Sequence, residues 1–390
     1  MTEHGKRDPR ETMMQRTRHF AALALPVLAL LTIPCARAAG PREPAPQRGK
    51  APQPPAAPDL VSRITTLRQG GARLDWLGDR IAFDMRGPAG TWAVYTMRPD
   101  GSDVRCVSCD VPELPKRNVG QPAWHPSGRY LVVQAEKETH TRVRMARVVT
   151  PGAGVLNDLW LVDLETRHAT LLRDVGDTRG DGVLHPHFSH DGNRLSWGEM
   201  QEPGSLRKGK EMGYWALMTA DFRLAGGKAR LENVRSYTPG GPAFYENHGF
   251  SSDGSQLLFA SNYQARKRFE GHIYLMDLAT QRVTRLTTED YNEHAQFSPD
   301  GSTIAWISTT GNRNNGTDYW FMNPDGSNKR RVTWFNQPGN PQSNGSKVVV
   351  ADFAWRPDGT AIAAYFREGG PALETASSDT KIVLIELRTK

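Results

Sequence analysis

A chain of 390 residues, 38% of them hydrophobic, is long enough to bury a sizeable core, as one large domain or two smaller ones, which excludes an intrinsically disordered protein. The formal net charge is +7, of which +3 falls in the first 38 residues, where six basic and three acidic side chains lie. The remaining +4 is too small a charge to indicate nucleic-acid binding.

A secretory signal peptide is predicted over residues 1–38. Its hydrophobic segment runs for 15 residues from Phe20 to Pro34, which is too short to span a bilayer. Arginines precede this segment, and Ala36-Arg37-Ala38 follows it with the small residues typical of a cleavage site, so cleavage is expected after Ala38. The mature protein would then be periplasmic or secreted, with no transmembrane span.

Two alternatives concern the same segment. Lipidation at Cys35 would make the protein a lipoprotein, although Ile33-Pro34 fits badly where small residues normally precede the modified cysteine. Translation that starts at Met13 or Met14 instead of Met1 would give a signal peptide of more usual length.

Residues 39–58 are predicted to form a proline-rich spacer. Seven prolines lie between Gly40 and Asp59, a composition that favours extended polyproline II and has no apolar face to pack. The folded domain is therefore expected over residues 59–390.

Removal of the signal peptide would leave Cys106 and Cys109 as the only cysteines. In an oxidising compartment this C-x-x-C spacing favours a local disulfide. Redox activity would require the first cysteine at the start of a helix, whereas Asp103-Val104-Arg105 indicates a strand. Two free thiols are the other alternative.

The folded domain consists of a unit that recurs six times. Most copies contain an aromatic anchor, a turn such as Ser-Pro-Asp-Gly, and a second hydrophobic run, so that each copy reads as strand, tight turn and strand. Third and fourth strands follow, as in Tyr274–Arg282 and Arg282–Leu286. Four strands per unit predict an all-β fold, a six-bladed β-propeller of four-stranded blades. The aromatic anchors are Trp76, Trp124, Phe188, Phe250, Phe297 and Trp355.

The ends of the chain provide a mechanism for closing the ring. The last unit supplies Phe353–Trp355, Ala361–Phe366 and Ile382–Leu387, and the chain then ends one strand short. Arg63–Leu67 has the pattern of a fourth strand and lies alone before the first blade. We therefore expect this N-terminal strand to pair onto the last blade.

The repeated F-S-P-D-G, followed by M-x-x-D-G-S, resembles the TolB-like, or WD40-like PD40, propeller family over about residues 59–390. TolB itself carries an α/β domain before its propeller, and the proline-rich spacer takes that place here. Prolyl-oligopeptidase-type enzymes add a hydrolase domain with a G-x-S-x-G elbow, which this sequence lacks. The resemblance implies the propeller fold, and propellers of this type serve as scaffolds, as substrate-gating domains and occasionally as enzymes.

Any functional site is expected on the face of the propeller where the innermost strands begin. The long loops between second and third strands lie on the same face. Three of these loops are basic, and their charges either form a face that binds an acidic partner or simply solvate the loops. The candidate ligand-binding residues are Arg142, Arg144, Arg147, Arg207, Lys208, Lys210, Arg266, Lys267 and Arg268.

Polar residues also recur three positions before the aromatic anchors: Arg73, Gln121, His185, Asn247, His294 and Asp352, with His187 and His248 beside them. Such residues either bind ordered water and tie blades together, or hold a divalent metal through His185, His187, His248 and His294.

The second alternative is similar, in fold and type of site, to the propeller oligogalacturonate lyases, in which histidines at strand entries hold a metal. That resemblance implies removal of a proton next to a uronate carboxylate, with Glu246, Glu293 or Arg73 as candidate base.

The sequence as a whole favours a non-enzymatic, monomeric binding scaffold without a cofactor, whose partner is an envelope or secreted protein or an anionic polysaccharide. The alternative is a metal-dependent lyase or hydrolase of anionic glycans at the channel mouth.

Overall fold

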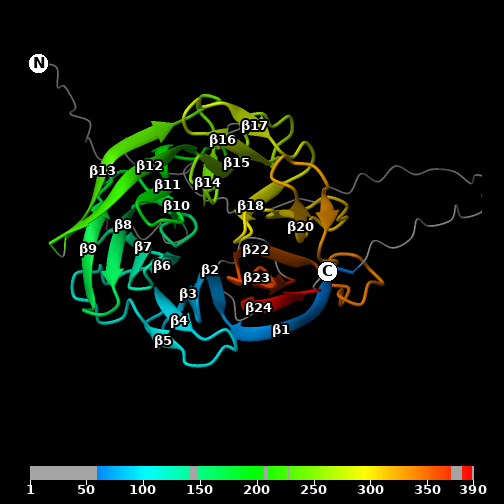
Figure 1. Ribbon diagram of the computed structural model, residues 1–390, viewed down its shortest axis with the longest axis horizontal. Helices are drawn as coiled ribbons and strands as arrows, with labels where there is room; N and C mark the ends of the chain where they lie inside the picture. Colours follow the sequence, from blue (N-terminus) through cyan, green and yellow to red (C-terminus); the bar gives the residue numbers. More distant parts are fainter. Residues whose placement is uncertain (1–58, 140–147, 206–209, 227, 370–379, 389–390) are drawn as a thin grey trace, which may run out of the picture.

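The computed structural model describes residues 59–139, 148–205, 210–226, 228–369 and 380–388. These residues form strands joined by turns and loops, and six four-stranded antiparallel sheets surround a central axis (Figure 1). The predicted six-bladed β-propeller is confirmed. No helix in the described ranges is long and apolar enough to cross a membrane.

Each blade is numbered from its innermost strand outwards. The first three blades are β2 (Gly71–Leu77), β3 (Arg80–Arg86), β4 (Trp92–Met97) and β5 (Arg105–Cys106); β6 (Val119–Trp124), β7 (Tyr130–Glu136), β8 (Asn157–Asp163) and β9 (His168–Arg173); and β10 (Val183–Phe188), β11 (Arg194–Glu202), β12 (Tyr214–Ala225) and β13 (Lys228–Tyr237). The last three are β14 (Tyr245–Phe250), β15 (Gln256–Ser261), β16 (His272–Asp277) and β17 (Val283–Arg285); β18 (Asn292–Phe297), β19 (Ile304–Ser308), β20 (Asp318–Met322) and β21 (Arg330–Arg331); and β22 (Val348–Trp355), β23 (Ala361–Glu368), β24 (Thr380–Leu387) and β1 (Val61–Gln69).

The repeated turn joins the first two strands of a blade. In the fifth blade the N–H of Gly301 donates to the carbonyl of Ser298 over 2.8 Å, and Gly301 has a φ of 71°, which glycine adopts readily. The Asp300 carboxylate accepts hydrogen bonds from the Ser298 hydroxyl and the Ser302 N–H, at 2.6 and 3.0 Å. The motif is therefore a self-contained hairpin turn, which explains why variants of it recur in the other blades.

The ring closes where the chain ends meet. Strand β1 pairs antiparallel with β24, with Ile64 opposite Ile385 and Thr65 opposite Leu384 (Figure 1). The predicted closing strand is confirmed. It extends from Val61 to Gln69 and is therefore longer than the expected Arg63–Leu67.

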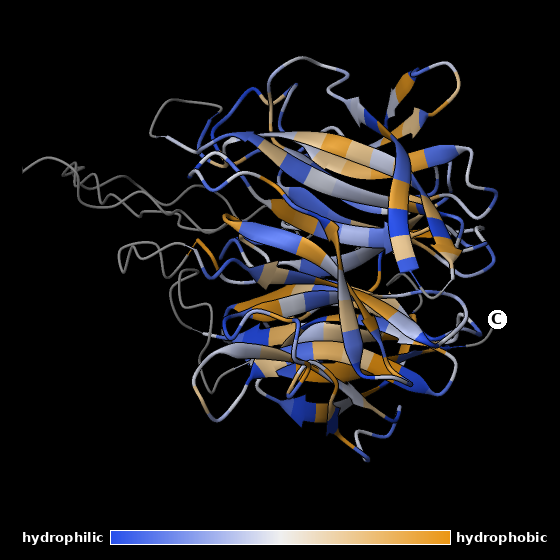
Figure 2. Ribbon diagram, turned by 90° about the vertical axis from the view of Figure 1, so that its left-hand side faces the viewer, coloured by the Kyte–Doolittle hydropathy of each residue, from blue (hydrophilic) through white to orange (hydrophobic). Residues whose placement is uncertain are grey.

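The hydrophobic core is divided among the interfaces between blades. One cluster joins the fifth and sixth blades through Phe321, Phe353, Trp355 and Val61 of the closing strand. Side chains alternate between the two faces of each strand, and Figure 2 shows the corresponding alternation of hydrophobic and hydrophilic residues along the strands. Each blade thus packs on two neighbours around the ring.

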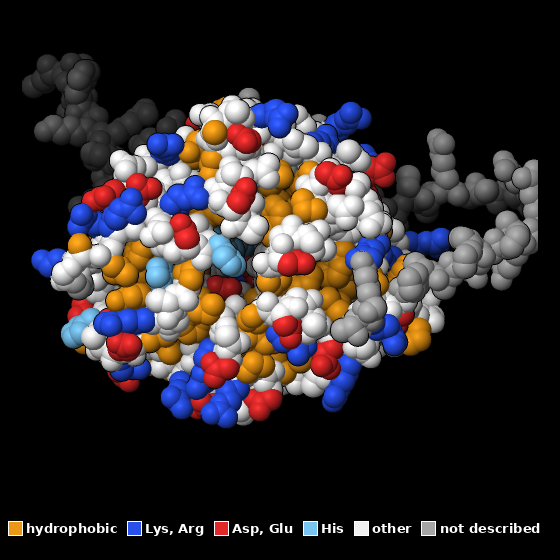
Figure 3. Space-filling view, in the orientation of Figure 1, with side chains coloured by type: hydrophobic (Ala, Val, Ile, Leu, Met, Phe, Trp, Pro, Cys, Tyr) orange, Lys and Arg blue, Asp and Glu red, His pale blue; other side chains and the backbone are white. Residues whose placement is uncertain are grey.

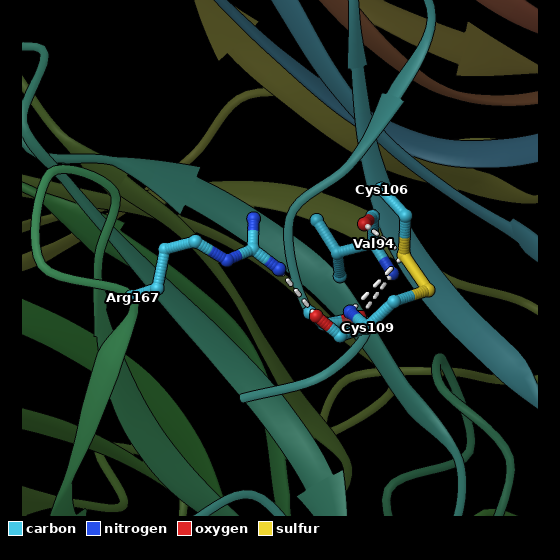
Figure 4. The surroundings of a disulfide bond; sticks show 5 residues. Val94, Cys106, Cys109 and Arg167 are labelled. Carbon is cyan, nitrogen blue, oxygen red and sulfur yellow. Dashed lines mark hydrogen bonds between the residues drawn. A yellow bond between two sulfur atoms is a disulfide. The ribbon is translucent and has the colours of Figure 1, made fainter. Parts of the chain in front are cut away.

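A disulfide joins Cys106 and Cys109 at the outer edge of the first blade (Figure 4). The Cys106 sulfur lies 3.6 Å from the carbonyl oxygen of Val94, and the Arg167 guanidinium donates to the carbonyl of Cys109. The bonded pair thus lies at the contact between the first two blades.

Candidate metal centre in the channel

Every inner strand is interrupted at the same level. In all six blades two residues of the first strand lie opposite one residue of the second, so the register shifts by one residue. Three of the interrupting residues, Gln121, His185 and His294, have φ of 47°, 47° and 45°, the left-handed region that residues with side chains seldom adopt. Such bulges redirect side chains. One polar residue from each interruption lines the central cavity: Arg73, Gln121, His185, His248, His294 and Asp352.

The fourth blade differs from the expected ring of residues. Its register shift falls between Asn247 and Phe250, so His248 lines the cavity in place of Asn247. Asn247 is fully buried and donates to the carbonyl of His185 and the hydroxyl of Ser196, at 2.8 and 3.0 Å. The count of residues before the anchor missed this because the bulge of the fourth blade lies one residue closer to its anchor than the bulges of the second, third and fifth blades.

Three of the four candidate histidines face one another. The ring centroids of His185, His248 and His294 lie 5.6 to 6.0 Å apart. Figure 3 shows histidine and acidic side chains in the hollow at the centre of the ring. The fourth candidate, His187, also lines the cavity, and burial lowers its pKa to about 3.

Glu246 lies between these histidines. Its Oε1 is 2.7 Å from Nε2 of His185, and one ligand atom each from His185, Glu246 and His294 lie within 4.8 Å of one another. Ligands on opposite sides of an ion with bonds of about 2.1 Å would be separated by about 4 Å, so the spacing is close to that of a coordination sphere. His185 and His294 also line the central cavity, which has a volume of about 30 Å³.

Two polar atoms of this cluster are buried without a hydrogen bond. Oε2 of Glu246 and Nε2 of His248 lie 3.7 Å apart, and neither has a hydrogen-bond partner among the described residues. Both residues are less than 7% exposed, at 4% and 6%. Because an unsatisfied buried polar atom costs free energy, these atoms fit a site that a bound group completes.

The charges of the cluster are strongly coupled. Burial by itself would lower the pKa of His294, but the surrounding carboxylates, Asp352 first, raise it to about 10. Burial would raise the pKa of Glu246, but the charges of His185 and His294 hold it well below its usual range. Burial also holds the pKa of His248 well below its usual value. His248 is therefore neutral, the form that binds metals.

A second buried acid lies beside the cluster. Oε2 of Glu293 is 3.3 Å from Nε2 of His294, and burial, followed by the charge of Glu246, raises the pKa of Glu293 to about 7. Glu293 also lines a small pocket with Phe244, Phe269 and Tyr291. This buried acid thus borders a pocket that is separate from the central cavity.

The opposite wall of the cavity carries a fixed cation. Asp84, which is fully buried, accepts hydrogen bonds from Nε and Nη2 of Arg73 at 2.6 and 3.0 Å, and the guanidinium lies 4.4 Å from the ring centroid of Trp92. Sequence reasoning did not single out Asp84. The sequence feature that could have identified it is a single acidic residue inside a hydrophobic second strand, Ile81-Ala-Phe-Asp84.

The basic loop residues do not form one described face. Arg142, Arg144, Arg147, Arg207 and Lys208 lie outside the described residues. Lys210 pairs with Glu202, and Arg268 lies 3.0 Å from Glu211. Arg266, Lys267 and Arg268 are exposed and line a cleft of about 610 Å³ beside the fourth and fifth blades. Acidic residues line the same cleft: Glu270, Glu289 and Asp290.

Comparison with known proteins bears on the fold. TolB from Acinetobacter baumannii is 18% identical with a TM-score of 0.50, over 80% of this chain and 66% of TolB, just under two thirds. The protein has the TolB-like propeller fold. An oligogalacturonate lyase in complex with manganese superposes less well, with 14% identity and a TM-score of 0.46 over 83% of this chain and 93% of the lyase.

A mutant puromycin hydrolase gives 14% identity and a TM-score of 0.48, over 79% of this chain and 54% of that protein. No protein-family model and no curated protein matches the sequence. At these identities the likeness concerns the fold alone, so the chemistry of this TolB-like propeller has to be argued from its own residues.

Proposed function

We propose that His185, Glu246 and His294 hold a divalent transition metal ion at the channel mouth, with His248 as a further ligand. The convergence of these side chains from three blades carries the proposal. The buried atoms Oε2 of Glu246 and Nε2 of His248, which lack hydrogen bonds among the described residues, support it. Imidazole and carboxylate together suit ions such as zinc, iron, manganese or nickel.

With the ion bound, the protein would act on an anionic glycan as a lyase or hydrolase. A metal ion at this position would polarise a bound carboxylate and acidify the neighbouring C–H group. Glu293, buried beside His294, is the candidate proton acceptor on this chain. Arg73, held by Asp84 on the opposite wall, would orient the anionic group of the substrate.

A non-enzymatic scaffold for an envelope protein or anionic polymer is the second candidate. It is supported by the cleft of about 610 Å³ that Arg266, Lys267 and Arg268 line. For both candidates a periplasmic or secreted location is proposed from the signal peptide, since residues 1–58 lie outside the described residues.

Metal analysis separates the two candidates. Protein purified without a histidine tag should contain about one equivalent of transition metal, and the double variant His248→Ala/His294→Ala should contain none. His168→Ala is the matched control, because His168 lies on the outside of the propeller and pairs with Glu113. A wild-type protein without bound metal, after incubation with each candidate ion, would exclude the metal centre and leave the scaffold.

A further inference from the structure

Gln121 has an unsatisfied donor at the central cavity. Its Oε1 accepts the N–H of His185 over 2.9 Å, across the boundary between the second and third blades. This hydrogen bond identifies the other atom of the carboxamide as the Nε2 donor. Nε2 is buried and has no hydrogen-bond partner among the described residues, although Gln121 is only 4% exposed and lines the cavity.

The same buried acid organises Gln121 and Arg73. Oδ2 of Asp84 accepts the backbone N–H of Gln121 at 2.9 Å and Nε of Arg73 at 2.6 Å. Arg73 also donates from Nη2 to Oδ1 of the same carboxylate, at 3.0 Å. Two donor groups of one wall therefore share a single anchor, and both are fixed before a ligand arrives.

The negative charge in the cavity lies near the histidines of the proposed metal centre. Oδ1 of Asp352 is 3.8 Å from Nδ1 of His185 and 3.7 Å from Nδ1 of His294. Asp352 is thus directed at the imidazoles, and the wall of Arg73 and Gln121 presents donors. A volume of about 30 Å³ admits one small group and excludes a sugar ring.

We propose that Arg73 and Gln121 form the recognition half of this cavity and bind the carboxylate of a ligand, whose remaining part stays outside the channel mouth. The inference rests on the proposed function, because the opposite wall is the proposed metal centre. It assigns a specificity-determining role to Gln121: its N–H donates to the carboxylate, and its carbonyl positions His185.

The variant Gln121→Glu tests this assignment. It keeps the acceptor for the His185 N–H and replaces the donor by a negative charge. Calorimetry with D-galacturonate as probe and D-galactose as its neutral counterpart should show that wild-type protein binds only the acid. In Gln121→Glu the affinity for galacturonate should fall at least about 10-fold with metal content unchanged. Gln281→Glu, the same change on an exposed outer turn, is the matched control.

Three results would overturn the proposal: equal affinity of wild-type protein and folded Gln121→Glu, equal binding of galactose and galacturonate by wild-type protein, or no galacturonate binding at millimolar concentration. If Gln121→Glu does not fold, Gln121→Met removes both the donor and the acceptor of the carboxamide without adding a charge, and an affinity for galacturonate equal to that of wild type would again overturn the proposal. Metal analysis of wild-type protein tests the metal centre separately. If wild-type protein binds galacturonate but contains no metal, the proposed function is contradicted and the role of Gln121 stands.

Discussion

Nε2 of His185 lies 2.7 Å from Oε1 of Glu246, across the boundary between the third and fourth blades. Both side chains are buried, at 7% and 5% exposure. The contact joins His185, which lies in the interruption of its inner strand, to Glu246, which pairs regularly with Ala260 in the next blade. It is therefore both an interblade contact and the centre of the candidate metal site.

The variant Glu246→Gln should destabilise the metal-free protein. Replacing the carboxylate by an amide removes one of the counter-charges of the buried imidazoles, and breaking a buried ion pair typically costs about 3 kcal/mol or more. We expect a loss of about 3 kcal/mol at pH 6, measured by urea unfolding in the presence of a chelator. Glu113→Gln is the matched control: its contact with His168 is exposed, so a much smaller change is expected. Equal effects of the two substitutions would show that the buried pair has no special role.

The backbone of His185 predicts an order among substitutions. Because His185 has a φ of 47°, glycine fits this conformation better than alanine does. The free energy of unfolding of metal-free His185→Gly should exceed that of His185→Ala by about 1 kcal/mol, the reverse of the usual order in a strand. Both variants should lose metal equally, since both lack the imidazole. Greater stability of the alanine variant would contradict the strained conformation.

His272 should make stability depend on pH. Burial, followed by the charge of Arg285, lowers the pKa of this imidazole, so it stays neutral in the folded protein while the unfolded chain takes up a proton below about pH 6.5. Stability should therefore fall as the pH drops from 7.5 to 5.5. In His272→Gln the fall should be shallower, measured as urea midpoints with a chelator present. Parallel curves for wild type and variant would contradict a depressed pKa.

The disulfide should contribute modestly to stability. Cys106 and Cys109 are separated by three positions, so the bond closes a very short loop and constrains the unfolded chain little. Loop-closure entropy predicts a loss of about 2 kcal/mol for Cys106→Ser/Cys109→Ser. Alkylation of unfolded, unreduced protein followed by mass spectrometry checks the bond itself. Two alkylated thiols would instead indicate free cysteines.

The sequence by itself determined the fold, including how the ring closes. A Ser-x-Asp-Gly turn is built from local hydrogen bonds and a glycine conformation, so each copy can be recognised without knowledge of its neighbours. Arg63–Leu67 could be assigned to the last blade because that blade lacked one strand and this segment lacked a partner.

Only the tertiary structure decided which polar residues meet. The bulges depend on pairing between strands, and a shift of one residue brings His248 to the cavity and buries Asn247. The roles of Asp84, Gln121 and Glu246 depend on contacts across blade boundaries, where partners lie far apart in sequence. Local sequence patterns specify each blade, whereas the site is formed by contacts between blades.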